Sequence, residues 1–310
     1  MKKFIIKMIT IITVLFLFIT SIEMVYRKNN KLDSDNTFKF KNVPSGIEIC
    51  NFGSSHGELG FNYEMLEKKY VCFNFGLSAQ TLSYDYRLLQ NYINNIKNGA
   101  IVFIPISYFS LYGTDNGQTN ISKDKRYYKI MDKKYIKDYD PVFSIYMKFE
   151  SIESMTSNLV KTLLNKSEPN YVQINRYNRI GSIEIAKTDV IDVEKVLDTH
   201  INNTELTALY NMIDLCREHG ATPILLTTPF TRVYNNHMID DNPKLIEDFA
   251  DMMKKISNEL KVDYYNFSCD KDYIDNYSLF FDCQHLNKMG ALTFTDEIMN
   301  LIERDGYKVG

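Results

Sequence analysis

Three side chains suited to nucleophilic chemistry stand out in the sequence. Ser55 lies in a glycine-rich turn, GSSHG (53–57), and Asp282 and His285 lie three residues apart far downstream. A serine hydroxyl is a poor nucleophile until a base removes its proton. Histidine can act as that base near neutral pH, and an aspartate that accepts from the imidazole Nδ1–H fixes its tautomer. The residue types therefore predict Ser–His–Asp acyl chemistry, with Ser55 as the nucleophile.

The elements that must position these residues are short apolar runs, which alternate with helical patterns. The runs are at 47–52, 70–75, 100–106, 221–227 and 262–267, and the helical patterns at 57–69, 81–97, 204–219, 243–260 and 288–303. Such alternation predicts a three-layer α/β/α fold with a central parallel sheet covered on both faces. In open parallel sheets ligands bind at the carboxyl ends of the strands, and Ser55, Asp282 and His285 all follow predicted strands.

The GSSHG turn also fits the G-x-S-x-G nucleophile elbow of α/β-hydrolases. That fold places several strands before the elbow, whereas here the turn follows the first predicted strand. Its acid and histidine normally come from separate loops, whereas Asp282 and His285 are three residues apart. We therefore reject the α/β-hydrolase fold.

The motifs resemble instead the SGNH/GDSL hydrolase superfamily, over about residues 45–305. Gly53-Ser54-Ser55 is similar to the first block of the family, and Asp282-Cys283-Gln284-His285 is similar to its last block, D-x-x-H. The resemblance implies a flavodoxin-like α/β/α fold, a Ser55–His285–Asp282 triad and no cofactor or metal. With an N-terminal apolar segment, the chain looks most like the membrane-anchored branch that includes DltD-like and alginate-acetylation proteins.

The resemblance also implies an oxyanion hole, the set of donors that stabilises the negative oxygen of the reacting ester. The amide of Ser55 and the amide of Gly76, which matches the family's second-block glycine, would be two of its donors. The family's third block often has G-x-N-D, whose Asn completes the hole, but this chain has Pro105-Ile106-Ser107-Tyr108. Ser107 is the expected substitute donor.

The remaining histidines and cysteines give weaker signals. His56 is next to Ser55, but adjacent side chains diverge, so we expect no direct role for it in most arrangements. His200, His219 and His237 show no metal-ligand spacing. Five cysteines without a close C-x-x-C pair argue against a disulfide framework or a structural zinc site, and a Cys269–Cys283 disulfide is left open.

The N-terminus is predicted to be membrane-embedded. Residues 8–22 carry no charge and 4–26 contain only Lys7 and Glu23, close to the ~20 apolar residues that span a bilayer. A cleaved signal peptide is the alternative, but no small-x-small cleavage site follows. We predict a signal anchor at 1–26, a linker at 27–45 and an SGNH-like domain at 46–310 with an insertion at about 111–203.

The function predicted from these features is a membrane-anchored, extracytoplasmic serine acyltransferase or esterase. Its substrate would be an acyl ester of a cell-envelope glycan or teichoic acid, and its partner the bilayer. The alternative is a non-catalytic SGNH-like adaptor of a polytopic membrane O-acyltransferase, which the missing third-block Asn favours. A net charge of −3, from 36 Lys and Arg against 39 Asp and Glu, excludes a strongly basic nucleic-acid binder.

Overall fold

The protein is described from a computed structural model that covers residues 2–28, 37–113, 121–148, 183–190, 193 and 195–309. Its chain divides into two compact units, which are described separately here. One unit comprises residues 42–120 and 176–310, and the other residues 1–41 and 121–175. The predicted boundaries at residues 26 and 45, and the insertion at 111–203, stay predictions.

The first unit contains a parallel sheet of five strands within the described residues, in the order β2-β1-β3-β4-β5. The strands are β1 (Ile47–Asn51), β2 (Cys72–Asn74), β3 (Ile96–Pro105), β4 (Thr222–Thr227) and β5 (Tyr264–Asn266). This is the flavodoxin-like order, in which the winding direction reverses between β1 and β3. Ligands bind at such a reversal, beyond the carboxyl ends of the strands, and Ser55 and Ser107 follow these two strands.

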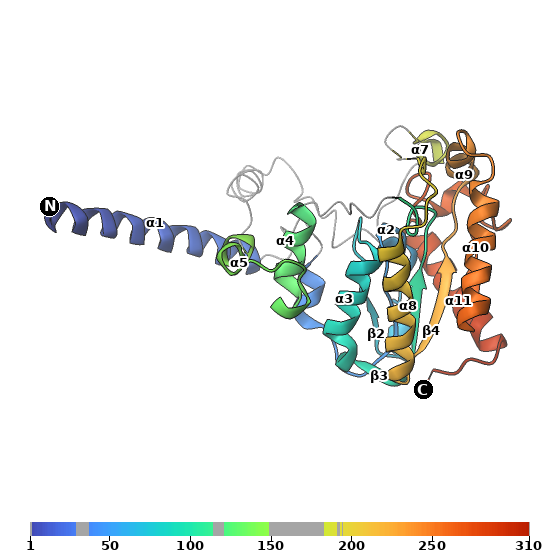
Figure 1. The fold of residues 1–310 in the computed structure, drawn as a ribbon, viewed down its shortest axis with the longest axis horizontal. Coiled ribbons are helices and arrows are strands. Elements are labelled where there is room, and N and C mark those ends of the chain that lie inside the picture. The colour runs from blue at the N-terminus through green and yellow to red at the C-terminus, as the bar shows by residue number, and fades with distance from the viewer. Residues whose placement is uncertain are drawn as a thin grey trace. The chain divides into compact units, whose positions relative to one another are not determined.

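Helices cover both faces of this sheet. The helices of this unit are α2 (Ser55–Gly60), α3 (Leu82–Tyr92), α7 (Ile183–Thr188), α8 (Asn203–Glu218), α9 (Arg232–Ile239), α10 (Leu245–Leu260) and α11 (Lys288–Arg304), with short 3₁₀ turns at Leu66–Lys68, Ile93–Asn95 and Tyr277–Leu279. Figure 1 shows α3 and α8 side by side along the sheet, where they pack against one another. The three-layer α/β/α fold predicted from the sequence is confirmed.

The alternation of side chains along the strands divides the core into two layers. Ile49, Phe103 and Leu226 pack in one cluster with Phe294 and Ile298 of α11. Neighbouring strand residues point to the opposite face, and these are equally buried: Cys50, Val102, Ile104 and Leu225 are 0% exposed. Both faces of the sheet are therefore dry, as the near-continuous apolar strand sequences require.

Several predicted element boundaries differ from the structure. The helix predicted at 57–69 ends at Gly60, because Phe61 adopts an extended conformation and inserts into the core, where its ring stacks on Phe103. The helix predicted at 81–97 ends at Tyr92, and β3 begins at Ile96, where it pairs with Ile47 of β1. Helix α9 was not predicted. Asn is a favoured N-cap residue, and Asn287 caps α11, since its side chain accepts from the Gly290 amide.

The five cysteines are all free, so the Cys269–Cys283 disulfide that the sequence left open is not formed. Four of them are buried, and only Cys269 is exposed. They behave as small core residues, in line with the usual burial of free cysteine.

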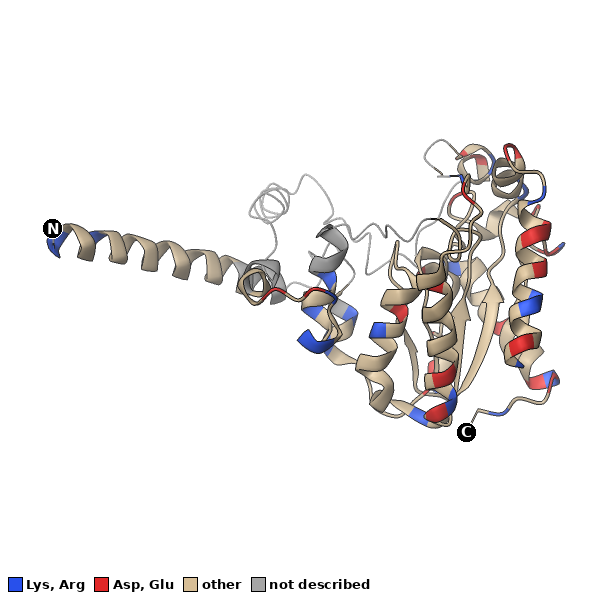
Figure 2. Cartoon of the chain, viewed as in Figure 1, with Lys and Arg blue, Asp and Glu red and all other residues tan. Residues whose placement is uncertain are grey.

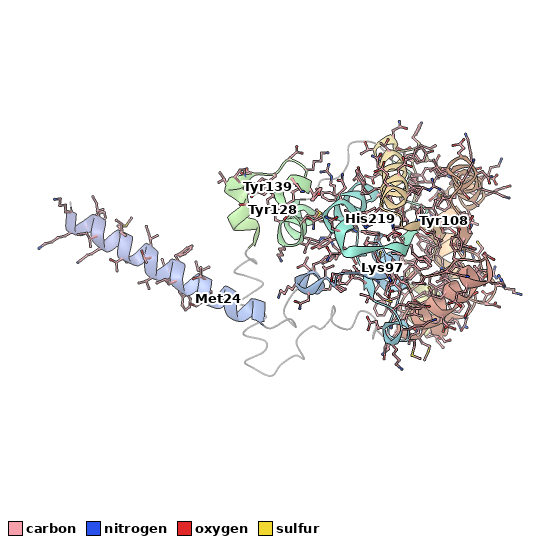
Figure 3. The ribbon with its side chains drawn as sticks, turned by 90° about the horizontal axis from the view of Figure 1, so that it is seen from below. Met24, Lys97, Tyr108, Tyr128, Tyr139 and His219 are labelled. Atoms are coloured by element: carbon pink, nitrogen blue, oxygen red, sulfur yellow. The ribbon has the colours of Figure 1, made fainter. Side chains whose placement is uncertain are left out.

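The second unit contains α1 (Lys2–Lys28), α4 (Ile121–Ile130) and α5 (Pro141–Lys148), with 3₁₀ turns at Phe38–Asn42 and Lys133–Tyr135. Its Tyr128 and Tyr139 rings stack with centroids 5.4 Å apart and line one cavity; both residues are labelled in Figure 3. From the sequence alone, plain packing is the favoured interpretation of Tyr127, Tyr128, Tyr135 and Tyr139, and the lining of a glycan groove is the alternative. The sequence pattern also predicts short helical pieces around 141–165; α5 begins there, and residues 149–182 lie outside the described residues.

Helix α1 is long and apolar enough to cross a membrane. The candidate span is Lys2–Ile22, 21 residues of which none is buried. Figure 2 shows this helix without charge along most of its length and basic at its N-terminal end. A signal sequence near an N-terminus has the same length and composition, so these two properties alone do not distinguish a membrane anchor from a signal sequence.

Candidate active site

The turn between β1 and α2 presents Ser55. Within Asn51–Tyr63, Ser55 is the one residue that is not fully buried. Gly53 adopts φ +106, a region that L-residues rarely occupy, and a Cβ there would lie 3.3 Å from the Cβ of Pro105. Its amide donates to Oδ1 of Asp85 at 2.9 Å. Glycine and a buried carboxyl group thus hold the turn that leaves the serine within reach of solvent.

His285 bridges Ser55 and Asp282. Its Nε2 lies 2.8 Å from the Ser55 Oγ, and its Nδ1 lies 2.7 Å from Asp282 Oδ2. Since Nδ1–H donates to the carboxylate, Nε2 is the unprotonated nitrogen and can accept the serine proton. The structure therefore brings together the three residues predicted from the sequence, in the geometry that general-base activation of a serine requires.

Asp282 is held both ionised and oriented. Burial alone would raise the pKa of this carboxyl group, but the adjacent His285 imidazole and several hydrogen bonds outweigh burial and hold the pKa below its ordinary value. Its Oδ1 accepts from the amides of Gln284 and His285 at 2.9 and 2.8 Å, which leaves Oδ2 for the imidazole. Each carboxylate oxygen thus has its own partners, so the group cannot swing away from the ring.

The turn that carries Asp282 and His285 is fastened to α9. Thr231 caps α9 by accepting from the Tyr234 amide, and its hydroxyl donates to the Cys283 carbonyl at 2.6 Å. Phe280 and Leu286 form an antiparallel bridge that closes the turn. Asp282 and His285 therefore lie on one short turn, and this bridge and the hydrogen bond from Thr231 hold its conformation.

A second histidine, His56, lies beside the triad. Its ring is 2% exposed, and its centroid is 5.1 Å from that of His285. Its Nδ1 lies 2.6 Å from the Ser107 Oγ and its Nε2 3.2 Å from Oε1 of Gln284. Burial, and next the positive charge that His285 can carry, lower the pKa of His56 to about 3, so the ring is neutral at ordinary pH. His56 is thus much closer to the reacting groups than the sequence suggested.

Ser107 and Gly76, the other predicted oxyanion donors, have partners within the protein. The Ser107 hydroxyl contacts His56 Nδ1, as described above. The Gly76 amide donates to Oδ1 of Asn74 at 2.9 Å. A Cβ on Gly76 would lie 2.5 Å from the amide nitrogen of Glu58, so glycine is required there for the turn after β2 to approach α2. Their role as oxyanion donors stays a prediction.

The turn after β2 contains a strained residue that no sequence motif marks. Ala79 adopts φ +56, a left-handed conformation that costs a non-glycine residue about 1 kcal/mol or more. Its amide makes no hydrogen bond within the described residues. The same turn is tied to the nucleophile turn, because the Leu77 amide donates to the Gly53 carbonyl at 3.0 Å. An unpaired amide in a strained turn is a candidate donor to a negative oxygen.

Asp85 supports the nucleophile turn from beneath. Its side chain is fully buried in α3 and accepts from the Gly53 amide and from Nε2 of Gln80. Burial raises the pKa of this carboxyl group to about 7, although these two hydrogen bonds lower it. The group therefore titrates near neutral pH, close to the turn that carries Ser55.

Asp85→Asn is expected to change how stability depends on pH. The pKa of Asp85 is about 7 in the folded protein against 3.8 ordinarily, so between these values the folded state binds a proton that the unfolded state has released. The contribution of Asp85 to stability therefore falls as the pH rises from about 4 to about 7. Asparagine keeps the oxygen acceptor and does not titrate. Between pH 5 and pH 8 the variant should gain on wild type by roughly 2–3 kcal/mol.

Denaturant unfolding of both proteins at the two pH values measures this gain. His56 changes stability with pH in the opposite direction. Its pKa is lowered from 6.5 to about 3, so its contribution to stability rises as the pH rises between these two values. Both proteins keep His56, so the difference between them isolates Asp85. A difference that is the same at pH 5 and pH 8 would contradict the raised pKa.

Comparison with known proteins gives only distant likenesses. No family model matches the chain, and no curated protein does either. Among solved structures, a GDSL-like lipase of Bacteroides thetaiotaomicron is 12% identical, with a TM-score of 0.40 and coverage of 86% of this chain and 90% of that one. A Bacteroides fragilis protein provisionally named an acylhydrolase is 14% identical, with a TM-score of 0.42 and coverage of 86% and 93%. The functional conclusions below therefore rest on the motifs and geometry of this chain.

Proposed function

We propose that the protein is a membrane-anchored serine acyltransferase or esterase of the SGNH type. Its substrate is an acyl ester of a cell-envelope polymer, either a polysaccharide or a teichoic acid. The observation that carries this proposal is the continuous Ser55–His285–Asp282 hydrogen-bonded chain at the carboxyl edge of the sheet, with distances of 2.8 and 2.7 Å. A partly buried aspartate, a histidine and a reachable serine in this order are the parts of a nucleophilic acyl-transfer site.

The reaction proceeds in two steps. His285 Nε2 takes the proton of Ser55 as its Oγ attacks the ester carbonyl carbon, and the same imidazole then protonates the departing alcohol. The acyl group is left on Ser55 as an ester. In the second step His285 removes a proton from water or from an acceptor hydroxyl, which attacks the acyl-serine and restores the free hydroxyl of Ser55. Water gives hydrolysis, and a polyol or sugar hydroxyl gives acyl transfer.

The negative oxygen formed in both steps needs hydrogen-bond donors. The Ser55 amide makes no hydrogen bond within the described residues and is one donor. A second donor is expected from the turn after β2, where the Ala79 amide makes no hydrogen bond within the described residues. Gly76 could serve only by exchanging its present partner, the Asn74 side chain. Removal of one such donor typically costs about 100- to 1000-fold in rate.

Helix α1 gives the proposal its location. In this proposal the mainly apolar 21-residue span tethers the catalytic unit to a bilayer, and action on a cell-envelope polymer requires that unit to be on the extracytoplasmic side. Tethering confines the enzyme and a membrane-borne acyl donor to one surface, which raises their effective concentration without any new contact. A polytopic membrane O-acyltransferase is a partner of suitable chemistry, since it would deliver acyl groups at the same surface.

A non-catalytic adaptor of such a membrane enzyme is the second candidate. The observation in its favour is that Ser107 and Gly76, two of three predicted oxyanion donors, are hydrogen-bonded to His56 and Asn74. An adaptor, however, has no need of a triad with distances near 2.8 Å. Catalysis therefore remains the preferred function.

A fluorophosphonate probe separates the two functions. Such probes phosphonylate a serine only when a base activates it. The detergent-solubilised full chain should therefore be labelled at Ser55, and denaturation before the probe is added should abolish the labelling. Ser278→Ala is a matched control, because the Ser278 hydroxyl is exposed and donates only to Asn276. That variant should label as wild type does, and Ser55→Ala should not. A folded wild-type protein that resists the probe would favour the adaptor.

A further inference from the structure

Three polar side chains beside the triad form a chain of hydrogen bonds with one direction. With the Gln284 amide oxygen toward the ring, His56 must donate through Nε2–H, at 3.2 Å. A neutral imidazole carries a single ring proton, so Nδ1 is an acceptor, and the Ser107 hydroxyl donates to it at 2.6 Å. The order of donation is therefore Ser107 to His56 to Gln284.

The end of this relay is an unused donor. Among the described residues, the side-chain NH₂ of Gln284 has no hydrogen-bond partner, and the side chain is only partly buried. Gln284 immediately precedes His285, and its amide oxygen is bound to the residue that follows Ser55. Because the His56 ring centroid lies 5.1 Å from that of His285, the Gln284 amide bound to His56 Nε2 lies in the neighbourhood of the triad. A chain of hydrogen bonds that all run one way also polarises its last member, which makes the NH₂ a better donor.

The surroundings of His56 explain why Gln284 is held so firmly. The His56 ring contacts Phe230 and Phe109 at centroid distances of 4.8 and 5.6 Å. The two phenylalanine rings offer the imidazole no acceptor. The low pKa of His56 keeps the ring neutral, so it has one N–H, and that N–H donates to the Gln284 amide oxygen. We therefore assign His56 no acid or base role; its hydrogen bond holds the Gln284 side-chain amide in one orientation.

We propose that the Gln284 side-chain NH₂ is a substrate-binding donor that selects an ester carrying an oxygen acceptor close to the reacting carbonyl, with His56 and Ser107 as positioning residues. This inference rests on the proposed acyl chemistry at Ser55 and specifies its substrate. An alkyl chain beside the Gln284 NH₂ would remove water from this donor without accepting a hydrogen bond from it. That cost is how a polar site discriminates against a substrate that lacks the acceptor. The acceptor oxygen belongs either to the acyl group or to the alcohol part of the ester.

Two pairs of isosteric esters distinguish these sources. The acyl pair is 4-nitrophenyl methoxyacetate and 4-nitrophenyl butyrate, in which an ether oxygen replaces one CH₂. The alcohol pair is 2-methoxyethyl acetate and butyl acetate. For each pair the preference is the ratio of the two kcat/KM values, measured with the full chain in detergent. Differences in intrinsic reactivity cancel when wild type and variant are compared.

Gln284→Met removes the donor and retains the side-chain length. We expect it to reduce the preference for the ether ester by about 3- to 10-fold in one pair, and the pair affected identifies the source of the oxygen. The kcat/KM for the alkyl ester of that pair should fall by less than the kcat/KM for the ether ester. Gln90→Met is the matched control, because Gln90 lies on α3 and donates to Tyr86 away from the site. It should leave both preferences unchanged.

His56→Phe and Ser107→Ala test the positioning roles. His56→Phe should lower the same preference as Gln284→Met does, because the amide is no longer held, and Ser107→Ala should lower it less. Nitrogen-15 spectra of labelled wild-type protein should show His56 as the neutral Nε2–H form at pH 5, whereas a merely space-filling histidine has no reason to favour that tautomer.

The outcomes are separable. Unchanged preferences in both pairs for Gln284→Met would overturn the inference, and so would an equal fall for both members of a pair, because that is a loss of catalysis and not of recognition. A His56 that is protonated or in the Nδ1–H form at pH 5 would overturn the relay. Wild-type protein that neither hydrolyses any ester nor labels at Ser55 would instead overturn the proposed function itself.

Discussion

Replacement of Ser55 or His285 by alanine is expected to abolish ester hydrolysis, with kcat lower by about 10⁴-fold or more. In the proposed mechanism Ser55 supplies the oxygen that attacks the carbonyl carbon, and His285, whose Nε2 lies 2.8 Å from that oxygen, is the base that makes it nucleophilic. Neither side chain belongs to the core, so the melting temperature should change by only a few degrees. Kinetics on a small chromogenic ester and thermal unfolding of the same preparations measure the two effects.

The double variant gives the sharper result. Residues that act as one unit show non-additive losses, so Ser55→Ala combined with His285→Ala should be hardly worse than either single change. His200→Ala is a matched control, since the His200 side chain is 93% exposed and pairs only with Asp198. It should retain full activity. Losses that multiply in the double variant would mean that Ser55 and His285 act separately.

Asp282→Asn is expected to lower kcat by roughly 10³- to 10⁴-fold and to change KM by no more than a few-fold. Asparagine has the shape of aspartate and can still accept from the Gln284 and His285 amides. Its NH₂ group, however, would face Nδ1 and favour the tautomer with the proton on Nε2, which cannot accept the serine proton. The catalytic loss is therefore a loss of the correct base and not of the fold.

Steady-state kinetics and the pH profile of kcat check this prediction. Near-normal kcat would show that Asp282 only shapes its turn, and a Ser–His dyad would then describe the site better. Asp275→Asn provides a control, because Asp275 is exposed and pairs with Arg232 at the surface. Exposed pairs of this kind contribute little, so both kcat and stability should be nearly unchanged.

The sequence predicted the sheet and the triad because both depend on local patterns. Buried parallel strands need continuous apolar runs, and such runs mark the strands here. Ser55, Asp282 and His285 follow these runs, so parallel topology alone brings their ends to one edge. Strand residues on the face opposite to Ile49, such as Cys50 and Val102, are also buried. Because both faces are buried, the strand sequences are apolar at consecutive positions.

The surroundings of the triad were harder to predict because they depend on contacts between distant segments. His56 was expected to diverge from Ser55, and adjacency in sequence gives no sign that Ser107 and Gln284 hold its ring. Asp85 is one acidic residue in the first turn of a helix, which usually marks a helix terminus and not a buried support. Phe61 lies within a stretch whose sequence pattern is helical. Burial of its ring against Phe103 nevertheless outweighs the local helix preference, and α2 ends before it.

The separation of 230 residues between Ser55 and His285 has a consequence for the timing of activity during biosynthesis. The apolar helix and the strand before Ser55 are synthesised well before the turn with Asp282 and His285. Until that turn packs beside the turn between β1 and α2, the serine has no base and behaves as an ordinary alcohol. Under the proposed mechanism, a chain that lacks the turn with Asp282 and His285 is chemically inert, and activity arises only once that turn has been translated and folded.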